Sequence, residues 1–145
     1  KALSSPASAR AMMPTLEVVA AALFDEAGRV LVTGRPPGKH MAGRQEFPGG
    51  KIAPGETRTA ALQRELREEL GIDIGAARFA LTLDHDYEDR RVRLHFYYVD
   101  SFSGTPQSLD GQTLTWVPIE ELHRQNILEA DAPFVALIQQ RRLPC

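Results

Sequence analysis

The residues best suited to chemistry are acidic side chains in the segment 50–72. Glu65, Glu68 and Glu69 are spaced at i, i+3 and i+4, so on a helix they occupy one sector about 100° wide. Like charges at this spacing destabilise a bare helix, and something must compensate for them. Carboxylate oxygens are hard ligands that suit Mg²⁺ or Mn²⁺. The spacing therefore indicates a divalent cation site, although Glu- and Arg-rich helix faces are more often only solvated surface.

Residues just before this segment add to the same pattern. Glu56 can fold back towards the acidic cluster, and the Pro-Gly-Gly turn at 48–50 permits a close approach of backbone to a ligand. A backbone carbonyl in that turn would complete a metal shell. Lys51 and Arg35 supply positive charge for phosphate groups.

Apolar periodicity predicts the elements that position these residues. Residues 57–70 have a helical period, with Thr57 as N-cap and Gly71 as the residue that ends the helix. We expect a hairpin of strands 16–24 and 30–35 around a turn at 25–29, and further strands at 78–84, 91–100 and 113–117. A short helix at 118–125, with Pro118 at its first position, and an amphipathic helix at 132–142 should follow. The segments expected to be irregular are 36–44, 46–56 and 104–112. This order predicts an α/β (α+β) fold, with a mixed β-sheet sandwiched between helices.

Length and composition exclude several classes of protein. The 145 residues are 43% hydrophobic and 25% charged, which is typical of one soluble domain with a real core. The net charge of -2 excludes a strongly basic nucleic-acid coat, and no apolar run approaches the roughly 20 residues that span a bilayer. The single cysteine, Cys145, excludes an intrachain disulfide and a cysteine-built zinc site. We expect a cytoplasmic monomer, in which residues 1–13 are a flexible tail without a signal peptide and residues 14–145 form one domain.

The acidic segment as a whole resembles the Nudix box. The pattern of that box is Gly, five residues, Glu, seven residues, Arg-Glu-apolar-any-Glu-Glu, one residue, Gly and an apolar residue. All nine defined positions are filled, by Gly50, Glu56, Arg64, Glu65, Leu66, Glu68, Glu69, Gly71 and Ile72. The resemblance extends more loosely over residues 15–140 and favours the MutT-type 8-oxo-dGTP diphosphatases, which have similar residues at 46–51 (EFPGGK), 89–90, 110–112 and 130–133.

This resemblance implies a hydrolase that converts a nucleoside triphosphate, with 8-oxo-dGTP as first choice, to the monophosphate and pyrophosphate. Such an enzyme cleanses the nucleotide pool and so avoids mutation of DNA. Its partner is a small nucleotide, rather than a nucleic-acid polymer or a membrane. The implied cofactor is Mg²⁺ or Mn²⁺, because a triphosphate carries dense negative charge that cations neutralise. The implied metal ligands are Gly49, Gly50, Glu56, Glu65, Glu68 and Glu69.

The resemblance also implies catalytic and substrate-binding residues. Glu65 is our choice of general base, with Asp110 as its rival, and Arg64 orients Glu68 or Glu69. The residues expected to bind substrate are Arg35, His40, Phe47, Lys51, Arg90 and Asp131.

Asp131 is the residue that we expect to determine which base the protein recognises. The resembling enzymes commonly place Asn here, which accepts from the N7–H of 8-oxoguanine and donates to O6. Ionised Asp only accepts, so it favours N7–H over the bare N7 of guanine but needs a proton or a backbone N–H to satisfy O6. An equally weighted alternative is that Asp131 caps the closing helix. His40 likewise has the alternative of an exposed loop histidine.

The same residues bear on three other possible functions. A phosphate-loop NTPase is excluded, because Gly50-Lys51 is followed by Ile52 where that loop needs Ser or Thr. The Nudix chemistry would be unchanged if the substrate were CTP or another nucleoside triphosphate. A non-catalytic nucleotide-sensing module is a third hypothesis, but such a module would be free to lose glutamates that are all present here.

Overall fold

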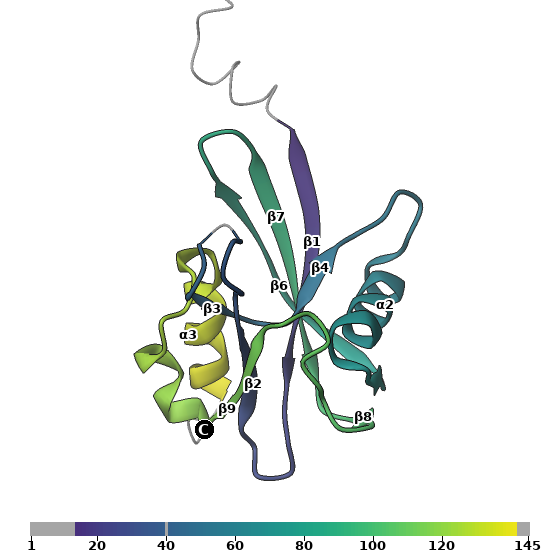
Figure 1. Cartoon of the computed structure of the whole chain (residues 1–145), viewed down its shortest axis with the longest axis vertical. Coiled ribbons are helices and arrows are strands. Elements are labelled where there is room, and N and C mark those ends of the chain that lie inside the picture. The colour runs from purple at the N-terminus through teal and green to yellow at the C-terminus, as the bar shows by residue number, and fades with distance from the viewer. Residues whose placement is uncertain (1–13, 40, 142–145) are drawn as a thin grey trace, which may run out of the picture.

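The computed structural model describes residues 14–39 and 41–141, so the expectations for residues 1–13, His40 and 142–145 fall outside the described chain. Two β-sheets form the centre, between helices on either side (Figure 1). The larger sheet has the strand order β4-β1-β7-β6. Its strands are β1 (Thr15–Leu23), β4 (Gly49–Lys51), β6 (Ala77–Asp86) and β7 (Arg91–Val99).

The smaller sheet has three strands, which come from distant parts of the chain. Its strand order is β3-β2-β9. The strands are β2 (Val30–Gly34), β3 (Gln45–Glu46) and β9 (Thr113–Val117), and β5 (Asp73–Ile74) pairs separately with β8 (Phe102–Ser103). The sequence did not predict the short strands β3, β4, β5 and β8, and β4 lies within the segment 46–56 that was expected to be irregular.

The predicted hairpin between the first two strands is wrong. β1 pairs in parallel with β7 and antiparallel with β4, so both of its edges are used. β2 pairs instead with β3 and β9, and only the bridge between Phe24 and Val30 joins the two arms. The turn itself is as expected, with Gly28 at a φ of 79°, but the chain changes sheet directly after it.

The acidic helix, α2 (Arg58–Leu70), begins and ends where the sequence predicts. The Thr57 side chain accepts a hydrogen bond from the amide of Ala60 at 3.1 Å. Gly71 ends the helix in the left-handed region, at a φ of 71°. The buried residues that pack this helix against the larger sheet are Ala61, Leu62, Leu66 and Leu70. The glutamates beside this stripe therefore lie at the border of the core.

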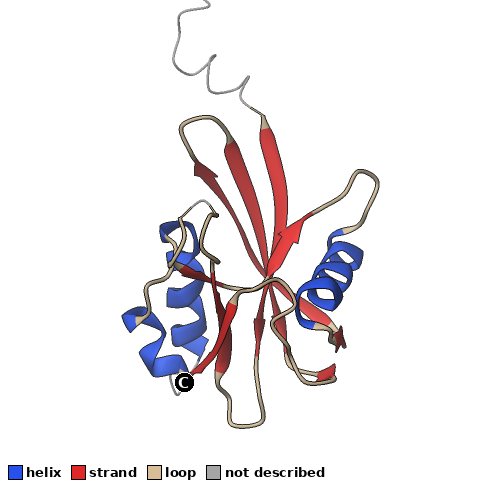
Figure 2. Cartoon of the chain, in the orientation of Figure 1, coloured by secondary structure: helices blue, strands red, loops and turns tan. Residues whose placement is uncertain are grey.

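The C-terminal segment covers the opposite side of the molecule (Figure 2). It contains the 3-10 helices η2 (Ile119–Arg124) and η3 (Glu129–Asp131) and the helix α3 (Ala132–Arg141). Phe134 of α3 stacks on Phe96 of β7, with ring centroids 4.4 Å apart. The short helix predicted at 118–125 is a 3-10 helix that Pro118 precedes rather than opens. The predicted mixed fold between helices is confirmed, and no helix in the described ranges is long and apolar enough to cross a membrane.

Candidate functional site

A cavity of about 360 Å³ is lined by both sheets, α2 and the C-terminal segment. One part of its wall is apolar and comes from β1 and β7, through Leu16, Val18, Val92 and Leu94. The charged lining residues are Arg35, Lys39, Glu46, Lys51, Glu69, Arg90, Asp110 and Asp131. A ligand that fills this cavity therefore meets apolar surface and charges of both signs.

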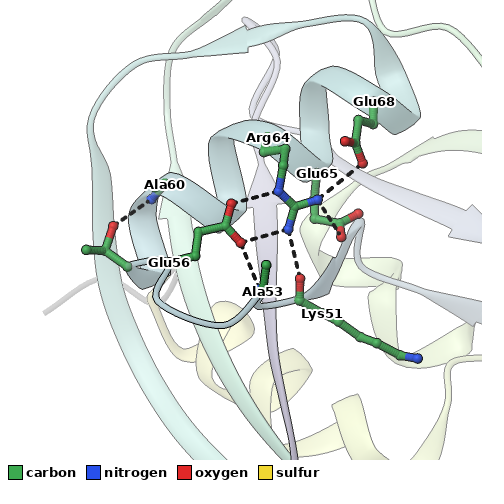
Figure 3. A network of polar contacts seen from close by, with 8 residues as sticks. Lys51, Ala53, Glu56, Ala60, Arg64, Glu65 and Glu68 are labelled. Carbon is green, nitrogen blue, oxygen red and sulfur yellow. Dashed lines mark hydrogen bonds and ion pairs between the residues drawn. The ribbon is translucent and has the colours of Figure 1, made fainter.

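Arg64 is the centre of an ion-pair network beside the cavity (Figure 3). Its guanidinium donates to both carboxylate oxygens of Glu56, at 2.7 and 2.9 Å, and to Glu65 and Glu68 at 3.2 Å each. It also donates to the carbonyl of Lys51 at 3.0 Å, which ties α2 to the end of β4. The side-chain hydrogen bonds from Arg64 lower the pKa of Glu56 to about 2. One arginine thus fixes three of the predicted acidic residues.

Glu69 lies on the cavity wall, apart from those three partners of Arg64. Burial, followed by the charges of Glu65, Glu46 and Asp110, raises the pKa of Glu69 to about 8, against a hydrogen bond from the Gly49 amide that lowers it. Burial also raises the pKa of Glu65. This part of the site therefore crowds several carboxyl groups together, and a bound cation would favour their ionised form.

The two glycines of β4 allow the close packing that this cluster needs. A Cβ atom on Gly49 would come within 1.9 Å of the carbonyl oxygen of Val19, in the neighbouring strand β1. A Cβ atom on Gly50 would come within 2.2 Å of the carboxyl carbon of Glu65. The sequence predicted close approach of a ligand here. The structure instead shows close approach of β1 and of the Glu65 side chain.

Asp131 lines the cavity from the C-terminal segment and is only 4% exposed. Burial, with a contribution from the charge of Glu46, raises the pKa of Asp131 to about 7. Its Oδ2 accepts a hydrogen bond from the amide of Phe47 at 3.3 Å. That amide belongs to the segment between β3 and β4, whereas the capping alternative requires an amide of α3. The ring of Phe47 is buried and packs edge-on against Phe134 at 4.9 Å.

The predicted phosphate-binding cations lie on the same cavity but differ in their surroundings. Arg35 donates to Glu46 at 2.9 Å, and burial raises the pKa of that glutamate. Lys51 extends its side chain away from the Arg64 network (Figure 3). The guanidinium of Arg90 lies 5.7 Å from the ring centre of Tyr87, and its Nε is buried without a hydrogen-bond partner among the described residues.

Several lining residues escaped the sequence reasoning. Glu46 was quoted only as part of a resembling segment, and Tyr87 was not singled out at all. The apolar wall carried a signal that could have been read. Leu16 and Val18 alternate with Glu17, and Val92 and Leu94 alternate with Arg93, so the sequence itself marks one apolar face of these two strands.

The carboxylate oxygens of the site are of the type that a hard divalent cation prefers, but their positions do not form a coordination shell. Within the described ranges, no group of three Asp, Glu, His or Cys side chains is placed to hold a metal ion. The reason is visible in Figure 3, where three glutamates turn towards Arg64. Glu69, Glu65 and Asp110 remain a carboxylate set with unfavourable mutual charge. Their chemistry fits a cation that draws the carboxylates together.

Comparisons with known proteins agree with this site. The NUDIX domain family model matches residues 13–138. In Escherichia coli (strain K12), a CTP pyrophosphohydrolase is 37% identical over 123 residues, covering 85% of this chain and 90% of that protein. From the same organism, an 8-oxo-dGTP diphosphatase is 32% identical over 128 residues, covering 88% and 99%.

A solved structure supports the same assignment. It comes from a study of MutT from Aliivibrio salmonicida and Vibrio cholerae, is 33% identical and superposes with a TM-score of 0.78. The match covers 88% of this chain and 98% of that one. The family model matches most of the chain, the fold is shared with a solved structure and every defined position of the glutamate motif is filled. This protein therefore belongs to the Nudix family.

Proposed function

We propose that this chain hydrolyses a nucleoside triphosphate to the monophosphate and pyrophosphate, with 8-oxo-dGTP as preferred substrate and Mg²⁺ or Mn²⁺ as the cation. One observation carries the proposal: a single cavity joins Glu69 and the glycine strand β4 to the buried carboxyl of Asp131. The relatives named 8-oxo-dGTP diphosphatase support it, as does the general use of divalent metal ions by Nudix hydrolases. The role would be removal of damaged nucleotides, by a monomer in the cytoplasm.

The cation would be held by the carboxylates that face or adjoin the cavity. We assign it to Glu69 and Glu65, with the backbone carbonyl of Gly49 or Gly50, and place Glu68 and Glu56 as further or supporting ligands. Bound there, it would neutralise triphosphate charge and lower the pKa of an attacking water. Arg64 orients the glutamates, because its five N–H donors are spread over three carboxylates and one carbonyl.

Glu65 remains our choice of general base. Burial raises its pKa, so it takes up a proton more readily than an ordinary glutamate. Arg64 holds Oε2 of this carboxylate, and Oε1 is the atom that would accept the proton of the water. Asp110 is the rival, since it lines the same cavity from an exposed loop.

The basic side chains would bind the triphosphate. Arg35, Lys51 and Arg90 approach the cavity from three different parts of the chain. The buried Nε of Arg90 is a donor that a ligand oxygen would satisfy, and leaving such a donor unpaired costs free energy. His40 stays an expectation for the same role.

Asp131 would read the purine edge in its protonated form. An Asp at this position needs a proton or a backbone N–H to satisfy O6, and a pKa of about 7 lets part of the protein keep that proton near neutral pH. A neutral carboxyl accepts from N7–H through one oxygen and donates to O6 through the other, as Asn does. The Phe47 amide would hold the carboxyl in place.

CTP is the second candidate, because a relative covering most of this chain is named CTP pyrophosphohydrolase. An ionised Asp131 would accept from the exocyclic amino group of cytosine. Recognition of 8-oxo-dGTP therefore requires a protonated Asp131, and recognition of CTP requires an ionised one.

A substrate panel tests the proposal. Purified protein with Mg²⁺ would receive 8-oxo-dGTP, dGTP, CTP and ADP-ribose at equal concentration, and products would be identified by ³¹P NMR. We expect pyrophosphate from 8-oxo-dGTP with the highest kcat/KM. Highest kcat/KM on CTP would establish the second candidate. Binding of these nucleotides without any hydrolysis would establish the sensing module instead.

A further inference from the structure

We infer that Gln112 is a positioning residue, which holds Asp110 at the reacting end of the cavity by fastening its loop to the last turn of α2. The inference rests on the proposed function, because it concerns how a carboxylate of that reaction is placed. The loop is the segment 104–112 between β8 and β9.

The loop first binds the end of the helix through its backbone. The amide of Gln107 donates to the carbonyl of Leu70 at 2.9 Å, and the amide of Leu109 donates to the carbonyl of Glu69 at 3.1 Å. Carbonyls in the last turn of a helix lack partners within the helix, so the loop satisfies groups that need it. Loop and helix end are therefore coupled.

Gln112 adds a side-chain clamp between two carboxylate-bearing residues. Its Nε2 donates to the carbonyl of Glu69 at 3.2 Å, and its Oε1 accepts from the amide of Asp110 at 2.9 Å. This orientation of the amide group is fixed by chemistry. The reverse orientation would place a carbonyl against a carbonyl and an N–H against an N–H. One side chain thus sets the distance between the backbones of Glu69 and Asp110.

The clamp is buried, while the loop tip that it holds is exposed. Gln112 is 8% exposed, whereas Asp110 is exposed and Leu109 beside it is 52% exposed. The Ser108 hydroxyl lies 3.0 Å from Oε1 of Gln112 and also approaches its backbone carbonyl, so it restrains the same amide. Because the tip of the loop buries little apolar surface, these hydrogen bonds determine where Asp110 points.

A double-mutant cycle tests whether Gln112 acts through Asp110. Gln112→Met keeps the length and apolar volume of the side chain but removes the clamp. We expect it to lower kcat by about tenfold or more while KM changes by less than about twofold. Within an Asp110→Asn background, the same change should cost less than about twofold, since the residue that it positions is already disabled. Gln107→Met is the matched control, because Gln107 is exposed and its hydrogen bond to the helix comes from its backbone amide.

A second measurement is independent of turnover. Hydrogen exchange of the Asp110 amide, followed in the metal-free protein, should become about tenfold faster in Gln112→Met and stay unchanged in Gln107→Met. If Gln112→Met fails to fold, Gln112→Asn replaces it, since the shorter amide cannot span both partners. Equal kcat losses in both backgrounds, or unchanged exchange, would overturn the inference. A wild-type protein that hydrolyses no triphosphate would instead refute the proposed function, and the exchange experiment would still decide the clamp.

Discussion

Charged side chains on the β6–β7 hairpin and beside α2 are of the same types but balanced differently. On the hairpin, each aspartate faces its own arginine across the two strands. Asp84 opposes Arg93 and Asp86 opposes Arg91, with a 2.8 Å hydrogen bond in each pair. The hydrogen bonds from Arg93 lower the pKa of Asp84. Each of these two carboxylates therefore has a cationic partner on the facing strand.

Beside α2 the balance fails. Arg64 is shared by three glutamates, and the pKa of Glu69 is raised to about 8 by burial and by neighbouring carboxylates. Both regions are rich in charge, so the number of charges does not distinguish them. The carboxyl group of Glu69 does, because it has no cationic partner among the described residues and it lines the cavity. Four experiments test this contrast.

Removal of divalent cations should give the largest effect. The crowded carboxylates beside α2 should support no turnover after metal stripping with EDTA, and Mg²⁺ or Mn²⁺ should restore it. Added cation should also raise the melting temperature of the stripped protein, since it binds the folded state. Pyrophosphate release would be followed, with Asp84→Asn as control for the balanced pairs. Undiminished turnover in stripped protein would remove the distinction between the two regions.

Glu69→Gln should lower kcat/KM by about a hundredfold or more, which is about 2.7 kcal/mol of transition-state stabilisation. Stability should respond in the opposite sense. The raised pKa means that folded protein keeps a proton which the unfolded chain has lost, so stability declines as pH rises from about 4.5 to about 8. The glutamine variant should lack that part of the decline and melt higher than wild type above pH 8 in metal-free buffer. A rate within threefold of wild type would assign Glu69 to solvated surface.

Asp131 should control the choice of base. Asp131→Ala should abolish the preference for 8-oxo-dGTP over dGTP while hydrolysis of the phosphate chain continues, because a buried polar partner gives strong discrimination. Asp131→Asn should keep the preference at every pH, whereas the wild-type kcat/KM for 8-oxo-dGTP should fall above pH 7, because the ionised carboxyl no longer donates to O6. The measurement is the ratio of kcat/KM values against pH. A substrate ratio unaffected by Asp131→Ala, with a loss of stability of about 1 kcal/mol, would support the capping alternative.

The balanced pairs should give the smallest effect. Asp84→Asn removes one exposed ion pair, and such pairs contribute roughly 0.2–1 kcal/mol. Activity and metal dependence should stay at wild-type values, and chemical denaturation should show only this small change. A loss of activity here would mean that charge balance does not separate the functional region from the rest.

The acidic helix could be predicted residue by residue because its signals are local. Thr57, Gly71 and the leucine stripe specify its start, end and buried face without reference to the rest of the chain. The pairing of β1 could not be predicted in this way, because a strand with buried residues on both faces does not reveal its neighbours. The hairpin prediction failed on this point.

The site shows the same division between local and distant information. The glutamates and glycines were named from spacing, but the sharing of Arg64 among three of them depends on side-chain directions. The partnership of Asp131 with Phe47 joins residues far apart in the chain. The raised pKa of Asp131 follows from burial that only the assembled fold creates.

The parallel pairing of β1 with β7 has a consequence for how the protein is made. β1 can pair with β7 only after β7 has been synthesised, many residues later. Non-local pairings of this kind slow folding. The contact between Phe47 and Asp131 comes later still. A nascent chain released as far as β6 can already form α2, yet it has no closed cavity. Nucleotide in the cell therefore cannot stabilise the cavity until the segment that contains Asp131 has also been synthesised and folded.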